Sequence, residues 1–404
     1  SKGKSRRRLA LMVALALSTG GGCLTSVDGG MIWGMSKAYA ADTHEYTETA
    51  TSINGLEGTD KTGFKSDNRI TLGTEGGPTN RPFSTYGIFS GGGKKNATED
   101  VSNNTLTIHG LSVSNGGTWS IVYGGISSTG TVTNNHVIFN NGHSKSPIYG
   151  GHNGASATKA VTGNSVTFTN GTLDGDAFGG YTTGTGAVTG NTVTIKGGSL
   201  GDEAAGGVIN NSASSANASG NTLTISGGAF TKSGGTNVFG AYNAGSGKTI
   251  NNIVNLGDGE NAMASGFNLT RVKIYGGNKT TVTDNTLNVK TNATAGNIAH
   301  FDKVKFDLNS TINPANSLLT LNNGAQTTGL NWAKLEVDTQ GLTGAGIKTY
   351  EPYKLNLIDN AAGIATTGYT GAKDSVTDKF EYIIDTDSHG GNATRYITLE
   401  GYQF

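Results

Sequence analysis

A repeat of about thirty residues constrains the fold of this chain more than any other feature. The stretch "GNTVTIKGG" from Gly190 to Gly198 returns as "GNTLTISGG" from Gly220 to Gly228. Aligned on the asparagine that opens each apolar run, the chain contains seven copies, spaced 27 to 33 residues apart. These anchor asparagines are Asn104, Asn135, Asn164, Asn191, Asn221, Asn252 and Asn285. A period of 20–50 residues indicates a solenoid, a propeller or another array.

Two further features accompany the anchors. A small apolar residue usually precedes the anchor by three positions, at Val101, Val132, Val161, Val188, Ala218 and Val282. Before Asn252 this place falls on Thr249, with Ile250 beside it, which predicts that this turn has slipped by one residue. An aromatic residue before two glycines recurs at Tyr123, Tyr149, Phe178 and Tyr275, with variants at Phe239 and Ala205. Each unit therefore carries three short extended pieces.

The alternation within each copy is typical of a β-strand. In "NTVTI" the side chains of Val193 and Ile195 point to one face, and those of Thr192 and Thr194 point to the other. Helices are disfavoured, because 65 of the 404 residues are glycine and no apolar 3.6-residue period persists.

One such unit buries too few apolar side chains to offset the conformational entropy lost on folding, so the units must stack. Stacked strands lie in register about 4.8 Å apart. The sequence therefore predicts an all-β fold, a right-handed parallel β-helix (β-solenoid) with about three strands per 27–33-residue coil. Propeller blades need about 40–45 residues, which is longer than these units. We expect the anchor asparagines to form an inward hydrogen-bonded column and the threonines to form flat, exposed ladders.

Residues 1–40 are typical of an extended signal peptide. A basic start is followed by an apolar run, Leu9 to Leu17, which is too short to span a bilayer. Cleavage is expected after Ala40, and lipidation at Cys23 is the competing interpretation. We further expect an N-terminal cap at 41–85, solenoid repeats at 86–300, and irregular coils with C-terminal antiparallel strands at 301–404. Within the last part, Phe380–Thr386 and Arg395–Gly401 predict a hairpin.

Removal of the leader leaves an acidic chain. The leader holds six of the 29 basic and one of the 29 acidic residues, which leaves 23 basic and 28 acidic residues and a net charge of −5. Nucleic-acid binding needs clustered positive charge, so we expect no nucleic-acid partner. The single cysteine, Cys23, lies in the leader, so the mature chain has no disulfide or thiol site.

The leader, the Asn-x-Val-Thr-Ile and Gly-Gly repeats and the later "YKLNLIDNAAGI" (Tyr353 to Ile364) resemble the passenger region of bacterial autotransporters, the type V secreted proteins, over residues 1–370. The resemblance implies a non-catalytic β-helix that is exported to the outer membrane and cell surface of a Gram-negative-type bacterium, or is secreted. It implies adhesion or a biofilm role, with host or neighbouring-cell glycans or proteins as partners. Such proteins end in a translocating β-barrel; we expect the chain to be a fragment or to be held at the membrane by a separate anchor.

One acidic cluster favours a different class of protein. It consists of Asp174, Asp176, Asp202 and Glu203, and positions 176 and 202 are about one coil apart. Converging carboxylates would suit a carbohydrate-active enzyme, a polysaccharide lyase or hydrolase, on the same scaffold. They would also suit Ca²⁺. We interpret them as solvated turn residues; a passive structural envelope component is the third hypothesis.

The remaining candidate motifs are weaker. Four histidines, His109, His136, His143 and His152, are interpreted as scattered surface imidazoles and not as a zinc site. "AGSGKT" (Ala244 to Thr249) lacks the early glycine of a phosphate-binding loop. Ser199 in "GGSLG" lacks the helix that follows a nucleophile elbow. We therefore expect no catalytic, cofactor-binding or metal-ligating residues, and no cofactor.

Overall fold

The chain forms two compact units, Ser1–Asp42 and Thr43–Phe404. The computed structural model describes residues 24–27, 30–33, 43–46, 66–73, 75–76, 87–93, 96–112, 120–261, 267–279, 284–322, 335–338, 341, 353–359, 369–374, 379–389 and 392–402. In the first unit, β1 (Leu24–Val27) pairs antiparallel with β2 (Gly30–Trp33). The basic start, Cys23 and the cleavage site at Ala40 lie outside the described residues, as does Val282.

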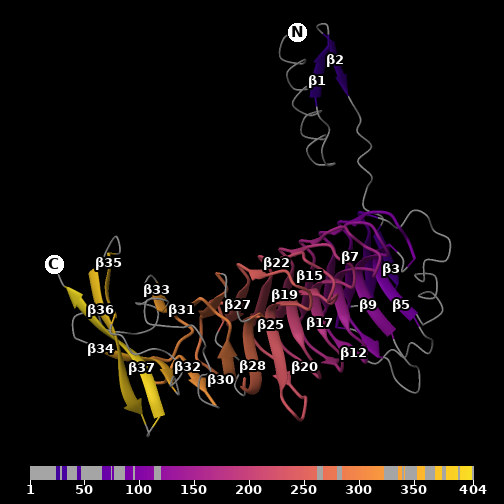
Figure 1. Ribbon diagram of the computed structural model, residues 1–404. Helices are drawn as coiled ribbons and strands as arrows, with labels where there is room; N and C mark the ends of the chain where they lie inside the picture. Colours follow the sequence, from indigo (N-terminus) through magenta and orange to yellow (C-terminus); the bar gives the residue numbers. More distant parts are fainter. Residues whose placement is uncertain are drawn as a thin grey trace. The chain divides into compact units, whose positions relative to one another are not determined.

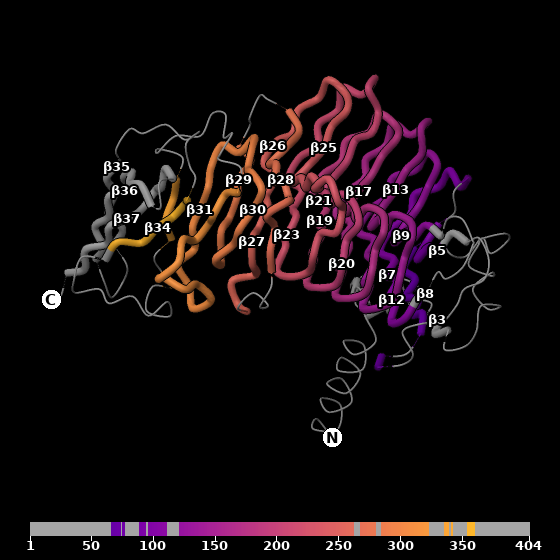
Figure 2. The backbone as a smooth tube through the Cα atoms, turned by 90° about the horizontal axis from the view of Figure 1, so that it is seen from below, coloured from indigo at the N-terminus to yellow at the C-terminus, as the bar shows by residue number. Residues whose placement is uncertain are grey.

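The second unit is a parallel β-solenoid, so the predicted all-β β-helix is confirmed. Four sheets run along it, and equivalent strands of successive coils are hydrogen-bonded neighbours (Figure 1). The backbone passes from coil to coil in sequence order (Figure 2). None of the described residues forms a helix. Accordingly, no helix in the described part of the chain is long and apolar enough to cross a membrane.

We name the four sheets after their sequence features. The anchor sheet consists of β3 (Thr43–Tyr46), β4 (Arg69–Leu72), β7 (Thr105–Ile108), β11 (His136–Phe139), β15 (Ser165–Phe168), β19 (Thr192–Ile195), β23 (Thr222–Ile225), β27 (Ile253–Leu256), β29 (Thr286–Val289), β31 (Lys303–Asp307) and β33 (Leu335–Asp338). The valine sheet consists of β6 (Val101–Ser102), β10 (Val132–Thr133), β14 (Val161–Thr162), β18 (Val188–Thr189), β22 (Ala218–Ser219) and β26 (Thr249–Ile250).

The other two sheets complete each coil. The corner sheet consists of β8 (Leu111–Ser112), β12 (Gly142–Ser144), β16 (Thr172–Leu173), β20 (Ser199–Leu200) and β24 (Ala229–Phe230). The glycine sheet consists of β5 (Gly87–Gly93), β9 (Ser120–Ser127), β13 (Ile148–Asn153), β17 (Ala177–Thr182), β21 (Ala204–Ile209), β25 (Thr236–Asn243), β28 (Leu269–Gly277), β30 (Ala293–Ala299), β32 (Leu319–Leu321), β34 (Tyr353–Asp359), β37 (Asn392–Tyr402), β36 (Lys379–His389) and β35 (Tyr369–Asp374).

A complete coil contains one strand from each sheet, as in β14, β15, β16 and β17. The three predicted extended pieces are the strands of the valine, anchor and glycine sheets. The corner sheet adds a fourth strand of two or three residues. Such a strand presents a single inward side chain, for example Leu173, so no period-two pattern marks it in the sequence.

The core is built from like side chains in register. Val137 pairs with Val166, which pairs with Val193, and all three are fully buried. Two residues further along the same strands, the rings of Phe139 and Phe168 stack with their centroids 5.3 Å apart. The outward threonines between them are half-buried rather than fully exposed, because each lies between its own copies one coil away.

The predicted slip at Thr249 is wrong. Thr249 pairs with Ala218, and Ile250 pairs with Ser219, so the valine sheet continues without a shift. Thr249 is fully buried in the place of the usual valine, and Ile250 points outward. A slip would displace Asn252, three residues later, from the asparagine column. Burying the hydroxyl of Thr249 costs less free energy than losing the hydrogen bonds of Asn252.

The ends of the solenoid extend the sheets in different ways. On the N-terminal side, β3 and β4 continue the anchor sheet into the segment expected to be a cap. On the C-terminal side, β31 and β33 continue it in parallel. The glycine sheet instead turns antiparallel beyond β34, where β36 and β37 pair along their whole length as the predicted hairpin.

Candidate functional site

A continuous column of buried asparagines runs beside the anchor sheet. Its members are Asn68, Asn104, Asn135, Asn164, Asn191, Asn221, Asn252 and Asn285, each at most 1 % exposed. From Asn68 to Asn252, each Nδ2 donates to the Oδ1 of the asparagine one coil later at 2.7–3.1 Å. The backbone N–H of each of these seven residues donates to that same oxygen at 2.9–3.2 Å. The seven anchors thus hold neighbouring coils together.

The eighth member, Asn68, was missed by the sequence analysis, although "NRITL" from Asn68 to Leu72 follows the anchor pattern. A second signal precedes every anchor: a residue with a positive φ, which turns the chain so that the next side chain points inward. These residues are Asp67, Asn103, Asn134, Gly163, Gly190, Gly220, Asn251 and Asp284. Asparagine, aspartate and glycine are the residues that tolerate this conformation best.

The paired glycines of the glycine sheet make room for the column. A Cβ on Gly180 would lie 2.4–2.6 Å from the amide group of Asn191. A Cβ on the preceding Gly179 would lie 2.7 Å from the backbone nitrogen of Thr192. The two sheets therefore approach backbone to backbone at this point. On either side of it the apolar residues form two separate clusters, one against the corner sheet and one against the valine sheet.

This close approach sets two columns of side chains on the outer face of the glycine sheet. Because both glycines face inward, the residues that flank them, such as Tyr149 and His152, both point outward with ring centroids 5.3 Å apart. The first column contains Tyr123, Tyr149, Phe178, Ala205, Phe239 and Tyr275. The second column contains Ile126, His152, Tyr181, Val208 and Tyr242.

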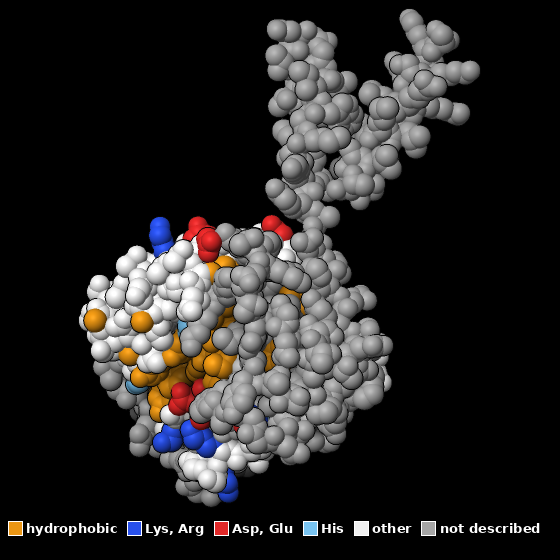
Figure 3. Space-filling view, turned by 90° about the vertical axis from the view of Figure 1, so that its right-hand side faces the viewer, with side chains coloured by type: hydrophobic (Ala, Val, Ile, Leu, Met, Phe, Trp, Pro, Cys, Tyr) orange, Lys and Arg blue, Asp and Glu red, His pale blue; other side chains and the backbone are white. Residues whose placement is uncertain are grey.

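The rings of these columns stack on one another along the solenoid. Tyr123 and Tyr149 lie 5.2 Å apart at 13°, and His152 and Tyr181 lie 5.2 Å apart at 11°. Burial raises the pKa of Tyr123 to about 12 and raises that of Tyr149 further. Figure 3 looks onto the N-terminal end of the solenoid, where hydrophobic side chains are visible among the polar side chains of the described residues. The two columns together form an aromatic strip on the outer face of the glycine sheet. Its half-buried members are Tyr149, His152, Tyr181, Tyr242 and Tyr275, and its other members are buried.

The predicted acidic cluster divides into two pairs with different surroundings. Asp174 is solvent-exposed and the side chain of Asp202 is 39 % exposed, and each has an ion-pair partner: His143 Nε2 lies 2.8 Å from Asp174, and Lys232 Nζ lies 2.5 Å from Asp202. These two fit the interpretation as solvated turn residues.

Asp176 and Glu203, in contrast, are half-buried. Each lies two residues before the first aromatic column (Phe178 and Ala205), and therefore on the same outer face. The backbone N–H of Glu203 donates to Asp176 Oδ1 at 3.0 Å. Burial is the main cause that raises the pKa of both carboxyls, and the negative charge of Asp202 raises both further. The charge of Asp176 also raises the pKa of Glu203.

The four histidines occupy separate positions. The ring of His109 lies 3.2 Å from Asn140 Nδ2, and His136 hydrogen-bonds Ser165 Oγ at 2.7 Å, with a pKa lowered by burial. His143 pairs with Asp174, and His152 stacks in the aromatic strip. Within the described residues, no three His, Cys, Asp or Glu side chains are grouped as metal ligands would be. Ser199 lies in the corner strand β20, and "AGSGKT" runs from a turn into β26.

No protein-family model, curated protein or solved structure matches this chain.

Proposed function

We propose that the chain is the non-catalytic passenger of an exported surface protein, and that it adheres to glycans or proteins of host or neighbouring cells through the aromatic strip. The leader and the resemblance to autotransporter passengers support export to a Gram-negative-type cell surface. The parallel β-solenoid is compatible with that role, since its length depends only on how many coils are stacked.

The observation that carries the proposal is the aromatic strip itself. Half-buried rings such as Tyr149, Tyr181 and Tyr242 present an apolar surface together with a polar group. The hydroxyl of Tyr181 accepts a hydrogen bond from the exposed Asn210 at 2.6 Å. A flat apolar surface with polar tips suits the faces of sugar rings and the aromatic-rich contacts of protein interfaces. Repetition over successive coils supplies many weak contacts at once, which raises the overall avidity.

Adhesion is tested with the full chain. Fluorescently labelled protein is applied to epithelial cells and to a second bacterial strain, and bound fluorescence is measured against concentration. The variant Tyr181→Ala should weaken binding several-fold, whereas Thr194→Ala, on the outer face of the anchor sheet, should bind like the parent chain. Circular dichroism of both variants checks that the solenoid is intact. Equal binding by the two folded variants would refute the strip as the adhesive surface.

A second candidate function, the carbohydrate-active enzyme, is favoured by one specific observation. Asp176 and Glu203 lie on adjacent coils beside aromatic rings, and burial raises the pKa of both, as a general acid requires. The test is the release of reducing ends or unsaturated uronates from a panel of polysaccharides. Activity that is lost in Asp176→Asn and Glu203→Gln would replace adhesion as the function. A chain that neither adheres nor cleaves would fit the passive envelope component.

A further inference from the structure

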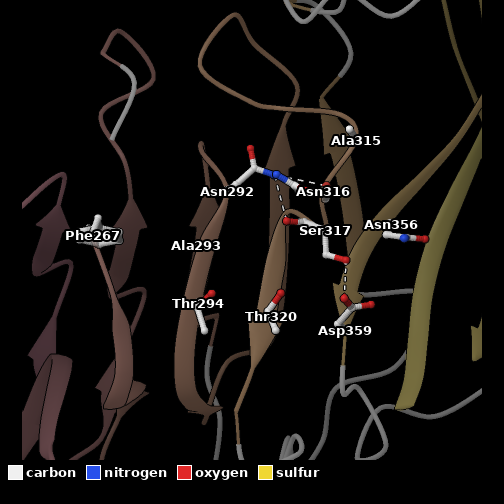
Figure 4. A pocket seen from close by; sticks show the side chains of 10 residues that line it. All are labelled: Phe267, Asn292, Ala293, Thr294, Ala315, Asn316, Ser317, Thr320, Asn356 and Asp359. Carbon is white, nitrogen blue, oxygen red and sulfur yellow. Dashed lines mark hydrogen bonds between the residues drawn. The ribbon is translucent and has the colours of Figure 1, made fainter. Parts of the chain in front are cut away.

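A separate pocket opens on the same sheet, beyond the aromatic strip. It has a volume of about 360 Å³ and lies over β30, β32 and β34 (Figure 4). Its floor includes a row formed by Thr294, Thr320 and Asp359, which are paired from strand to strand. The residues next to them in the strands, such as Leu319 and Leu321, belong to the core. The row therefore points to the outer face of the glycine sheet.

One wall of the pocket is a loop held in place by hydrogen bonds. The side chain of Asn292 donates to the backbone carbonyls of Asn313, Asn316 and Ser317 at 2.9–3.3 Å and accepts from the backbone N–H of Asn313 at 2.5 Å. Ser317 Oγ donates to Asp359 Oδ2 at 2.6 Å. The dashed lines of Figure 4 mark part of this network. The pocket wall is thus held in place by hydrogen bonds of the chain itself.

Several polar groups of the pocket make no side-chain hydrogen bond to the part of the chain that the structure describes. Within the described part of the chain, the amides of Asn316 and Asn356 and the hydroxyls of Thr294 and Thr320 make no side-chain hydrogen bond that would occupy them. The ring of Phe267, packed in part against the core, borders the same space. The pocket therefore combines unused amide and hydroxyl groups with one aromatic ring.

The charges of the lining select among ligand classes. Asp359 is the one ionisable residue among the described residues that line it, so an anionic ligand would meet a negative group and no positive one. A calcium ion takes six to eight oxygen ligands, usually from several carboxylates, and this lining has a single carboxylate, which already accepts from Ser317. A neutral polyhydroxylated ring matches the amides, hydroxyls and ring, and the volume is at the small end of ligand pockets.

We propose that this pocket binds a neutral saccharide of one or two rings. The proposal deepens the proposed function, on which it rests, by naming the ligand chemistry of one discrete site. The ring of Phe267 stacks against the apolar face of the sugar, while Asn316, Thr320 and Asp359 hydrogen-bond its hydroxyls.

The test is saturation-transfer NMR on the full chain with lactose, maltose, cellobiose and N,N′-diacetylchitobiose at millimolar concentration, and with 3′-sialyllactose as the anionic comparison. At least one neutral disaccharide should receive saturation, and its Kd should rise about fivefold or more in Asn316→Ala and in Thr320→Val, because each removes one hydrogen bond. The matched control is Thr222→Val, a half-buried threonine of the anchor sheet, which should leave the Kd unchanged.

Three results would overturn the pocket assignment: no transfer to any neutral disaccharide, preference for the sialylated sugar, or equal affinity in Thr320→Val and Thr222→Val. The cell-binding assay separates this failure from that of the proposed function. Adhesion by a chain that binds no saccharide overturns the pocket alone. Saccharide binding at the pocket without adhesion of the full chain supports the pocket and overturns adhesion.

Discussion

Replacing Asn191 by alanine tests whether the asparagine column holds the coils together. In the structure its Nδ2 donates to Asn221 Oδ1 at 3.0 Å, to the Val161 carbonyl at 3.0 Å and to the Thr189 carbonyl at 3.2 Å. Its Oδ1 accepts from both the Nδ2 and the backbone N–H of Asn164, each at 2.9 Å. The substitution removes all five hydrogen bonds from a fully buried site.

The cost follows from the groups left behind. The backbone N–H of Asn164 loses its acceptor and the carbonyl of Val161 loses this donor. The Val161 carbonyl keeps its place in the parallel pairing of β14 with β18, so only the N–H is left unsatisfied. An unsatisfied buried polar group costs about 1–3 kcal/mol, and the free energy of unfolding should fall by about that much. The neighbouring Thr192→Ala alters a half-buried outward side chain and should cost less than about 1 kcal/mol.

The assay is urea unfolding of both variants, followed by circular dichroism, with hydrogen exchange to locate the loss. Faster exchange in Asn191→Ala should be concentrated in the coils on either side of residue 191, since each coil contacts mainly its neighbours. If Asn191→Ala shifts the unfolding midpoint no more than Thr192→Ala, the column is not what joins the coils, and the reasoning fails.

Three further outcomes are expected. Gly180→Ala should lower the free energy of unfolding by about 1–3 kcal/mol through overlap with Asn191, whereas Ala241→Gly, at the equivalent place two coils later, should cost no more than about 1 kcal/mol; urea midpoints that show equal losses would contradict the overlap. Because the pKa values of Asp176 and Glu203 are raised in the folded chain, the folded state holds protons that the unfolded state has released, and stability should fall as pH rises from about 4; melting temperatures measured against pH should fall less steeply in Glu203→Gln, and an unchanged slope would contradict the assignment. Ultraviolet titration of tyrosinate should show that Tyr123 stays protonated at pH 11, because its pKa is about 12. The parent chain and Tyr123→Phe should therefore give the same tyrosinate signal up to pH 11 and differ above it; no difference above pH 11 would contradict this.

The fold was predictable because every coil carries the same pattern of inward-facing and outward-facing residues. The Asn-x-apolar-x-apolar pattern defines an inward asparagine and two inward apolar residues, and only stacking satisfies both. The corner strands were not predictable, because a two-residue strand such as Thr172–Leu173 is too short to show the apolar–polar alternation that marks a strand. Thr249 keeps the register of the valine sheet because Asn252 must remain in the asparagine column, a constraint that the side-chain type at position 249 does not reveal.

The candidate site was harder to predict from the sequence than the fold. The aromatic–Gly-Gly element was found, but its outward direction depends on two consecutive inward glycines, which break the simple alternation of a strand. The different burial of Asp174 and Asp176 also follows from that geometry and not from their spacing. The pocket over β30, β32 and β34 joins residues from four separate segments, including the non-repeating loop that ends at Ser317. No local pattern connects such segments.

The asparagine column has a polarity. Every hydrogen bond from one asparagine side chain to the next runs toward the coil of higher residue number, so the amide dipoles of the column point the same way and add. At one terminus Asn68 Oδ1 has no partner among the described residues; at the other, the carboxylate of Asp302 accepts the backbone N–H of Asn285 at 3.2 Å. Two columns joined through their Asn68 ends would place one Oδ1 acceptor opposite another, with no donor between them. Fibres or engineered arrays made from these coils should therefore elongate only head to tail.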